Sequence, residues 1–185
     1  IFKGEGKKIL KNEEIKSYLI IISLTTLIAT FFNALSSNFQ SLEEAFRHSI
    51  FQIVSIISTT GFVTHDYTFW SYPAFFVVIF VMLTGGTSGS TAGGIKIGRI
   101  LLFVKNFFVY LKKMMHPDSV TPLKFNQKMV SENISNITMV FIITYFTIFI
   151  ASSLFLTFFN IDIVTSFGAV ISSLGNIGPG FGKVG

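Results

Sequence analysis

Cysteine is absent from the 185-residue sequence, and charged residues make up only 12% of it. Without cysteine the chain has no disulfide framework and no thiolate metal site. A soluble domain carries roughly 25% charged residues, so the low charge counts against a soluble protein. Hydrophobic residues account for half of the sequence instead, and 23 of them are phenylalanine.

Long runs without any charged residue decide the class of protein. Residues 17–35 and 133–161 contain no charge, and a third uncharged run, 68–95, is rich in glycine near its end. A helix needs about 20 apolar residues to cross a bilayer. The first run is too long for the core of a signal peptide, and two glutamates, Glu13 and Glu14, stand among the lysines before it. The sequence therefore predicts an integral membrane protein.

The basic residues cluster in two places. Five of the 14 cations precede residue 17, and seven lie between Lys96 and Lys128. If the first run crosses outward and the third returns, both clusters face the cytoplasm, as the positive-inside rule requires. The connection 36–70 then lies outside, with three acidic residues and a single arginine. The net charge of +5 therefore indicates topology and contact with membrane lipid rather than a nucleic-acid partner.

Two shorter apolar segments are predicted to enter the membrane without crossing it. Ser41–Glu44 is a capping-box pattern that opens a helix to about Ser58. This segment carries too many polar residues for a span, so we expect a re-entrant helix that returns as an extended 59–62 segment. A second short helix is predicted at 162–174, before a glycine-bearing turn.

The two segments look like copies of one unit. Placing Gly61 on Gly178 brings Ser49 onto Ser166 and Ser55 onto Ser172. The order of long span, short helix and glycine turn occurs twice, and internal repeats are common in transport proteins.

A glycine-rich segment interrupts the third uncharged run. Helices are predicted at 72–83 and 95–115, and a helix broken by glycines within a membrane indicates a transport pathway. An ordinary loop between two helices is the alternative. A nucleotide-binding loop is excluded because Gly-Lys-Ser/Thr is missing. The segment consists of Gly85, Gly86, Thr87, Ser88, Gly89, Ser90, Thr91, Ala92, Gly93 and Gly94.

The turns after the short helices have the composition of a cation site. A dehydrated K⁺ needs several oxygen ligands, which backbone carbonyls supply without a fixed charge. Glycine allows successive carbonyls to turn toward one axis, and the carboxyl end of each preceding helix carries partial negative charge. The candidate potassium-binding residues are Thr59, Thr60, Gly61, Phe62, Asn176, Ile177, Gly178 and Pro179.

These motifs together resemble the Trk/Ktr/HKT superfamily of potassium transporters, and in particular its TrkH type. The resemblance rests on Ser58–Phe62, Gly85–Lys96, Met115–Asp118 and Asn176–Gly180. It implies an all-α fold of repeated helix–pore loop–helix units, with residues 85–94 as an intramembrane gate. It also implies a homodimer, a cytoplasmic nucleotide-binding regulatory subunit of the TrkA type, and multi-pass insertion in a bacterial plasma (inner) membrane.

On this basis the chain divides into four parts. Residues 1–16 are a cytoplasmic basic segment, 17–115 a third repeat, 116–132 a cytoplasmic loop, and 133–185 a fourth repeat without its inner helix. We expect a piece of a longer protein, because the sequence begins without methionine and ends in a glycine-rich stretch. The cationic residue that the family places on the last inner helix is then not assignable, and Lys183 does not replace it.

The expected function is gated, K⁺-selective uptake down the electrochemical gradient. Two alternatives remain open: a symporter that couples K⁺ to H⁺ or Na⁺, and a membrane scaffold without transport. No catalytic triad pattern or HExxH-like ligand spacing occurs, so an enzyme is the weakest hypothesis. K⁺ is expected as the transported ion, without an organic cofactor.

Overall fold

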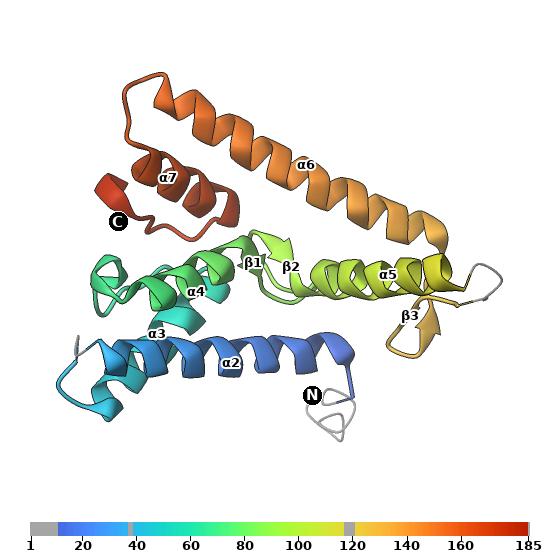
Figure 1. The fold of residues 1–185 in the computed structure, drawn as a ribbon, viewed down its shortest axis with the longest axis horizontal. Coiled ribbons are helices and arrows are strands. Elements are labelled where there is room, and N and C mark those ends of the chain that lie inside the picture. The colour runs from blue at the N-terminus through green and yellow to red at the C-terminus, as the bar shows by residue number, and fades with distance from the viewer. Residues whose placement is uncertain (1–10, 37–38, 117–120, 185) are drawn as a thin grey trace.

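The computed structural model describes residues 11–36, 39–116 and 121–184 (Figure 1). Parts of the predicted cytoplasmic segments, residues 1–10 and 117–120, lie outside this range. The helices are α2 (Glu13–Leu35), α3 (Leu42–Ile57), α4 (Tyr72–Leu83), α5 (Ile97–Met115), α6 (Glu132–Thr157), α7 (Ile163–Gly175) and the short 3₁₀ turns η1 (Tyr67–Phe69) and η2 (Gly182–Val184). Two minimal ladders complete the described part: β1 (Thr84–Gly85) runs parallel to β2 (Ile95–Lys96), and β3 (Lys124–Phe125) antiparallel to β4 (Lys128–Met129).

The two long helices correspond to the predicted spans. α2 has 23 residues and α6 has 26, so their lengths of about 35 and 39 Å exceed a hydrocarbon layer of about 30 Å. Each begins at a polar cap: the side chain of Asn12 accepts a hydrogen bond from Glu14 N (2.9 Å), and that of Ser131 accepts one from Ile134 N (3.5 Å). Long helices are therefore confirmed at both uncharged runs.

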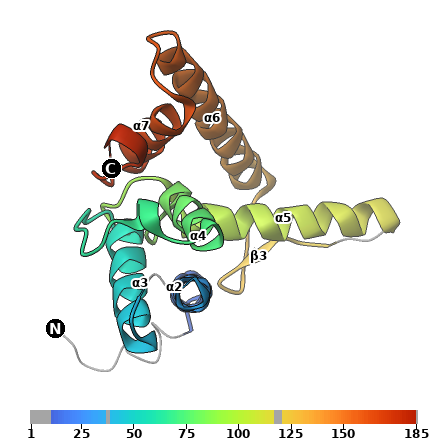
Figure 2. The same cartoon turned by 60° about the vertical axis from the view of Figure 1, so that its left-hand side comes forward.

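The short helices α3 and α7 are also where the sequence predicts them. Ser41 caps α3 by accepting a hydrogen bond from Glu44 N (3.1 Å), and Arg47 pairs with Glu43 one turn earlier (3.1 Å). α3 packs on α2 and α4, whereas α7 packs on α6 and α4 (Figure 2). α4 is therefore the element that both short helices share.

The core surrounds α4. Its inward face is fully buried at Ala74, Val78, Val81 and Met82. These side chains belong to one cluster with Ile53, Ile56 and Ile57 of α3 and Ile171 of α7. One apolar cluster thus fixes the two short helices relative to each other.

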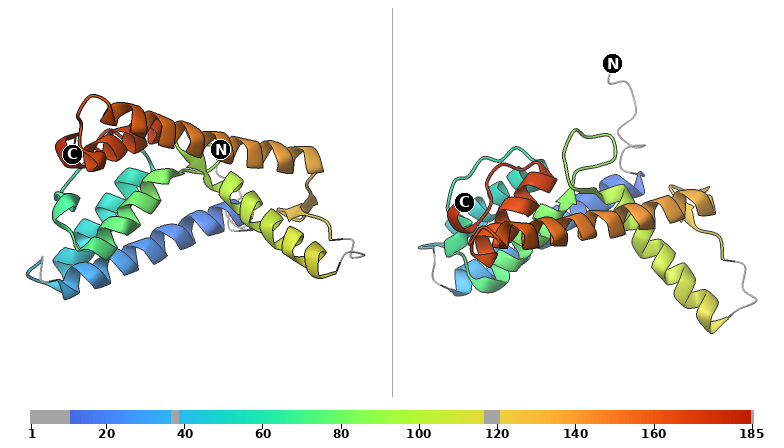
Figure 3. Two further views of the ribbon diagram at one scale, coloured as in Figure 1. Left: turned by 45° about the horizontal axis from the view of Figure 1, so that its top comes forward. Right: turned by 90° about the horizontal axis from the view of Figure 1, so that it is seen from above.

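The basic segments meet at one end of the molecule. Glu13, in the first turn of α2, accepts a hydrogen bond from Lys105 of α5 and another from Asn126 N (3.2 Å) in the β3–β4 turn. The start of α2, the second half of α5 and the start of α6 therefore lie at the same end, as the charge pattern predicted (Figure 1). Seen from above, α5 points away from the other helices (Figure 3).

Candidate functional site: two loops and a glycine-rich segment

The loops after α3 and α7 have positive φ angles at the same two positions. Thr59 and Asn176 both lie in the left-handed region, with φ of 56° and 52°, and Gly61 and Gly178 also have positive φ, 77° and 108°. Thr59 and Asn176 are separated by the same number of residues as Gly61 and Gly178. The loops are therefore repeats in structure as well as in sequence. The expectation of an extended 59–62 segment is wrong at Thr59 and Gly61, because both residues have positive φ and turn the chain after α3.

The hydrogen bonds that form the loops are repeated as well. Thr60 N donates to Ser55 O (2.9 Å) after α3, and Ile177 N donates to Ser172 O (3.0 Å) after α7. Both bonds close the carboxyl end of the short helix against its own loop. Each loop therefore starts at the helix end whose carbonyls carry partial negative charge.

A buried serine also holds one carbonyl of each loop. The hydroxyl of Ser55 donates to Phe62 O (2.7 Å), and that of Ser172 donates to Gly178 O (2.8 Å). Both serines are only 5% exposed. Each hydroxyl thus contacts the oxygen of one loop carbonyl and fixes the direction in which that carbonyl points.

The two loops touch each other through Gly61. A β-carbon at Gly61 would lie 2.3 Å from Ile177 O and 3.2 Å from Pro179 Cδ. The approach thus requires glycine, both for space and for its positive φ. The structure brings residues 59–62 and 176–179 together.

A tyrosine makes a second link between the loops. The buried Tyr67 donates a short hydrogen bond from its hydroxyl to Gly180 O. Burial, followed by the charge of Asp66, raises the pKa of the Tyr67 phenol, so the hydroxyl keeps its proton. The link therefore holds at any physiological pH.

Each loop has one uncovered side. A β-carbon at Gly178 would meet no atom within 4 Å. An apolar pocket of about 450 Å³ opens beside Phe62, which is 68% exposed. The pair of loops is thus uncovered at Gly178 and beside Phe62.

The glycine-rich segment lies against the carboxyl end of α7. A β-carbon at Gly93 would lie 2.2 Å from Gly175 O, and Gly94 N donates to Leu174 O (3.4 Å). The segment thus packs at the base of the second loop. Its ends are joined by β1 and β2, so α5 begins at Ile97, two residues after the predicted start.

Lys96 closes the glycine-rich segment on itself. Its ammonium group donates to Ser90 O (3.0 Å) and forms a shorter hydrogen bond with Ala92 O. A lysine thus satisfies carbonyls that no helix or sheet satisfies, and the segment is an ordered loop.

The described residues offer oxygen atoms rather than a conventional metal cage. Across 11–36, 39–116 and 121–184, no group of three or more His, Cys, Asp or Glu side chains gathers at one point. The oxygens that the loops carry are those of carbonyls and hydroxyls, a composition that suits a monovalent cation.

A profile of the TrkH family, described as cation transport proteins, matches residues 15–184. The chain belongs to the TrkH family. Its match includes both loops and the glycine-rich segment, so the fold is that of an all-α integral membrane protein with repeated re-entrant units.

Individual TrkH relatives agree with the profile. The chain is 34% identical over 166 residues to the Trk system potassium uptake protein TrkH of Escherichia coli K12, covering 89% of this chain and 33% of that protein. It is 25% identical over 183 residues to the Trk system potassium uptake protein TrkI of Halomonas elongata, covering 98% and 36%. The chain spans about a third of the length of the curated relatives it matches.

A solved structure shares the fold. The crystal structure of the potassium transporter TrkH from Vibrio parahaemolyticus superposes with a TM-score of 0.89 at 30% identity. The match covers 97% of this chain and 38% of that one. The arrangement of both loops around α4 is thus that of a TrkH-family protein.

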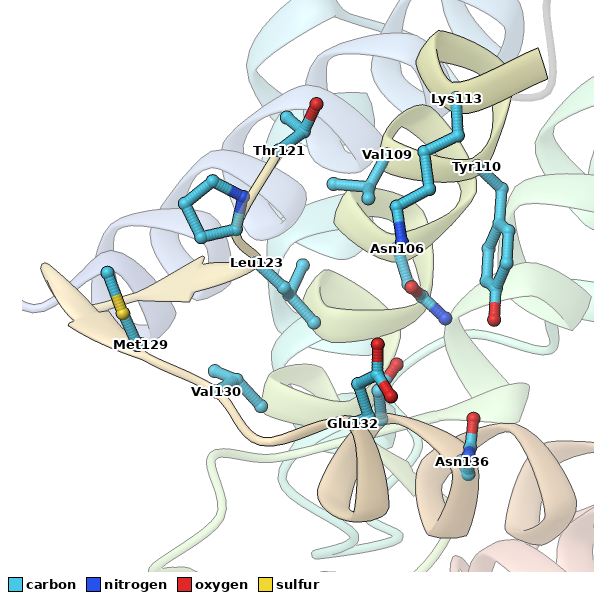
Figure 4. Close-up of a pocket in the computed structure, with 12 residues that line it drawn as sticks. Asn106, Val109, Tyr110, Lys113, Thr121, Leu123, Met129, Val130, Glu132 and Asn136 are labelled. Atoms are coloured by element: carbon cyan, nitrogen blue, oxygen red, sulfur yellow. The ribbon is translucent and has the colours of Figure 1, made fainter. Parts of the chain in front are cut away.

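This TrkH-family chain also has a polar pocket that does not include the two loops. It has a volume of about 240 Å³ and lies between α5, the β3–β4 hairpin and the start of α6 (Figure 4). Asn106, Tyr110, Lys113 and Glu132 line it, at the basic end of the molecule.

Three residues of the site were not found from the sequence. Tyr67 bonds the second loop, Lys96 closes the glycine-rich segment, and Glu14 reaches that segment from α2. Lys96 lies only four to six residues after the carbonyls that it binds, so a local pattern could have indicated its role. Tyr67 and Glu14 act over 113 and 74 residues, and no local pattern reports such distances.

Proposed function

We propose that this chain forms two walls of a gated, K⁺-selective uptake pathway in the inner membrane of a bacterium. The observation that carries the proposal is the close approach of two loops with the same positive-φ positions, where Gly61 meets Ile177 O. Repeated loops in contact can form part of a ring, and a ring of carbonyls can replace the hydration shell of K⁺.

The filter in this proposal consists of residues 59–62 and 176–179. Two walls cannot enclose an ion, so the free ends at Gly178 and beside Phe62 are where further loops would pack. Those loops come from sequence that flanks this chain or from another chain. The open environment of Gly178 supports this assignment, because its counterpart Gly61 is covered by a neighbouring loop.

The gate in this proposal is the segment 85–94. It lies against the carboxyl end of α7, so its displacement would open or close the route below the filter. Residues 17–115 then form one complete repeat and 133–185 a second repeat without its inner helix. Residues 1–16 and 116–132 face the cytoplasm.

The assembly in this proposal is that of a Trk system. The relatives are named as Trk system potassium uptake proteins, and a system has more than one component. We infer a homodimer in membrane lipid that binds a cytoplasmic nucleotide-binding subunit of the TrkA type. The proposed assembly includes neither a nucleic-acid partner nor an enzymatic activity.

The test is ⁸⁶Rb⁺ uptake with and without competing Na⁺, in a bacterial host that lacks K⁺ uptake. The chain is expressed with whatever sequence flanks it in its gene. Gly178→Ser should cut uptake or admit Na⁺, because a β-carbon at φ +108° strains the filter backbone. Asn160→Ser, at another positive-φ residue that lies outside both loops, is the matched control and should transport normally.

Unchanged uptake and selectivity in Gly178→Ser would remove residues 176–179 from the filter. A well-expressed wild type without Rb⁺ uptake, with the regulatory subunit present, would favour a scaffold. Uptake that requires an inward H⁺ or Na⁺ gradient would favour the symporter.

A further inference from the structure

Glu14 is a buried carboxylate at an unusual place. It lies in the first turn of α2, at the predicted cytoplasmic end of a span, and is only 8% exposed. A buried carboxylate is costly unless hydrogen bonds compensate it. Its neighbour Glu13 pairs with Lys105, whereas in the described part of the chain Glu14 has no salt bridge within 4.0 Å. Its hydrogen-bond partners therefore explain its burial.

One oxygen of Glu14 accepts three hydrogen bonds from the gate region. Oε1 accepts bonds from Ser88 N (2.6 Å), Ser88 Oγ (2.7 Å) and Gly98 N (3.0 Å). Ser88 lies in the middle of the glycine-rich segment, and Gly98 lies in the first turn of α5. The carboxylate thus joins three elements: α2, the segment and α5.

α5 needs such a partner. Its own cap residue is Lys96, whose side chain makes no capping hydrogen bond. A carboxylate at the amino end of a helix satisfies a free N–H and interacts favourably with the helix dipole. Glu14 therefore acts as the N-cap of α5 from another helix, and in doing so it holds Ser88.

Gly98 makes room for this contact. A β-carbon at Gly98 would lie 2.6 Å from Ser88 Oγ and 2.9 Å from Glu14 Oε1. Any larger residue would push the serine or the carboxylate away. The absence of a side chain at Gly98 and the position of Glu14 are thus two independent signs of one clamp.

We propose that Glu14 is a positioning residue that clamps the glycine-rich segment onto the start of α5 and thereby restrains basal ion flux. The restraint of ion flux rests on the proposed function. The contact of Glu14 with the segment does not, since it exists whatever the chain transports. Without the carboxylate, Ser88 loses both bonds to α2, and the segment is held at its base by Lys96 and the β1–β2 ladder.

The first measurement is the mobility of the segment and needs no transport. This chain contains no cysteine, so a spin label at Gly89→Cys, where a side chain meets no atom within 4 Å, reports on the segment. In the full protein, with any flanking cysteine replaced, Glu14→Ala should increase the mobile fraction of the label by about tenfold, because charge-assisted hydrogen bonds are lost.

The matched control is Glu13→Ala. It removes a carboxylate from the same turn that contacts Lys105 and Asn126 instead of the segment, so the label should remain as in the parent. Gly98→Ala should loosen the label by displacing the clamp. Ser88→Ala should have a smaller effect, since Ser88 N can still donate. A label equally immobile in Glu14→Ala and the parent overturns the clamp.

The second measurement is the basal leak of ⁸⁶Rb⁺ from vesicles that contain the full protein. These proteins keep Gly89 and carry no label. Glu14→Ala should raise the leak several-fold, and Glu13→Ala should not. A label that loosens without any change in leak confirms the clamp and refutes its role in restraining flux. Absence of Rb⁺ flux in parent and variants alike refutes the proposed function, while the label still decides the clamp.

Discussion

The loop after α3 and the loop after α7 differ in what surrounds them, although their backbone conformations match. A β-carbon at Gly61 would collide with the neighbouring loop at 2.3 Å, whereas one at Gly178 would meet nothing within 4 Å. The serines behind the loops also differ: Ser172 holds the carbonyl of the glycine itself, and Ser55 holds that of the residue after it. The comparison separates what a loop needs in order to form from what it needs in order to pack.

The largest expected effect is that of alanine at the two glycines. Both changes place a β-carbon at positive φ, at a cost of roughly 1–3 kcal/mol, and Gly61→Ala also collides with the backbone at Ile177. Gly61→Ala should therefore abolish ⁸⁶Rb⁺ uptake, and Gly178→Ala should do the same in the full protein, where the proposal places a further loop against Gly178. A measurable fraction of uptake retained by Gly178→Ala alone would contradict the packing of a further loop there.

A medium effect is expected at the two serines. Ser55→Ala and Ser172→Ala each remove one hydrogen bond to a loop carbonyl, worth about 1 kcal/mol. Because Ser172 orients the carbonyl of Gly178 directly, Ser172→Ala should change the Rb⁺/Na⁺ uptake ratio more than Ser55→Ala does. Ser173→Ala is the control, since that hydroxyl bonds to Ala169 O (2.7 Å) within its own helix. Equal selectivity in all three variants would show that the serines do not tune the filter.

The smallest effect is expected where the loops leave their helices. Thr59 and Asn176 share left-handed φ values, which asparagine tolerates better than a β-branched residue. Thr59→Asn should stabilise the protein by roughly 1 kcal/mol or less, and Asn176→Thr should destabilise it by a similar amount. Thermal unfolding in detergent measures both. Shifts in the same direction would mean that side-chain contacts, rather than backbone conformation, decide these positions.

Much of the fold was accessible from sequence because its determinants are local. The spans follow from uncharged runs, and the start of α3 follows from Ser41 and Glu44. The match of Gly61 with Gly178 predicted a structural repeat, which the shared positive φ values confirm. The assignment of these loops to a filter and of residues 85–94 to a gate stays a prediction.

By itself, the sequence determined that the chain is a membrane protein, where its helices lie to within a few residues, and that two glycine turns repeat. Charge, hydropathy and capping act over a few residues, so a reader of the sequence can see them. Only the tertiary structure decided that Gly61 faces Ile177, that Tyr67 holds Gly180, and that Glu14 binds Ser88 while it caps α5 at Gly98. Those contacts join residues 74 to 116 positions apart (Gly61 to Ile177 being 177 − 61), and only the packing of helices distant in sequence brings them together.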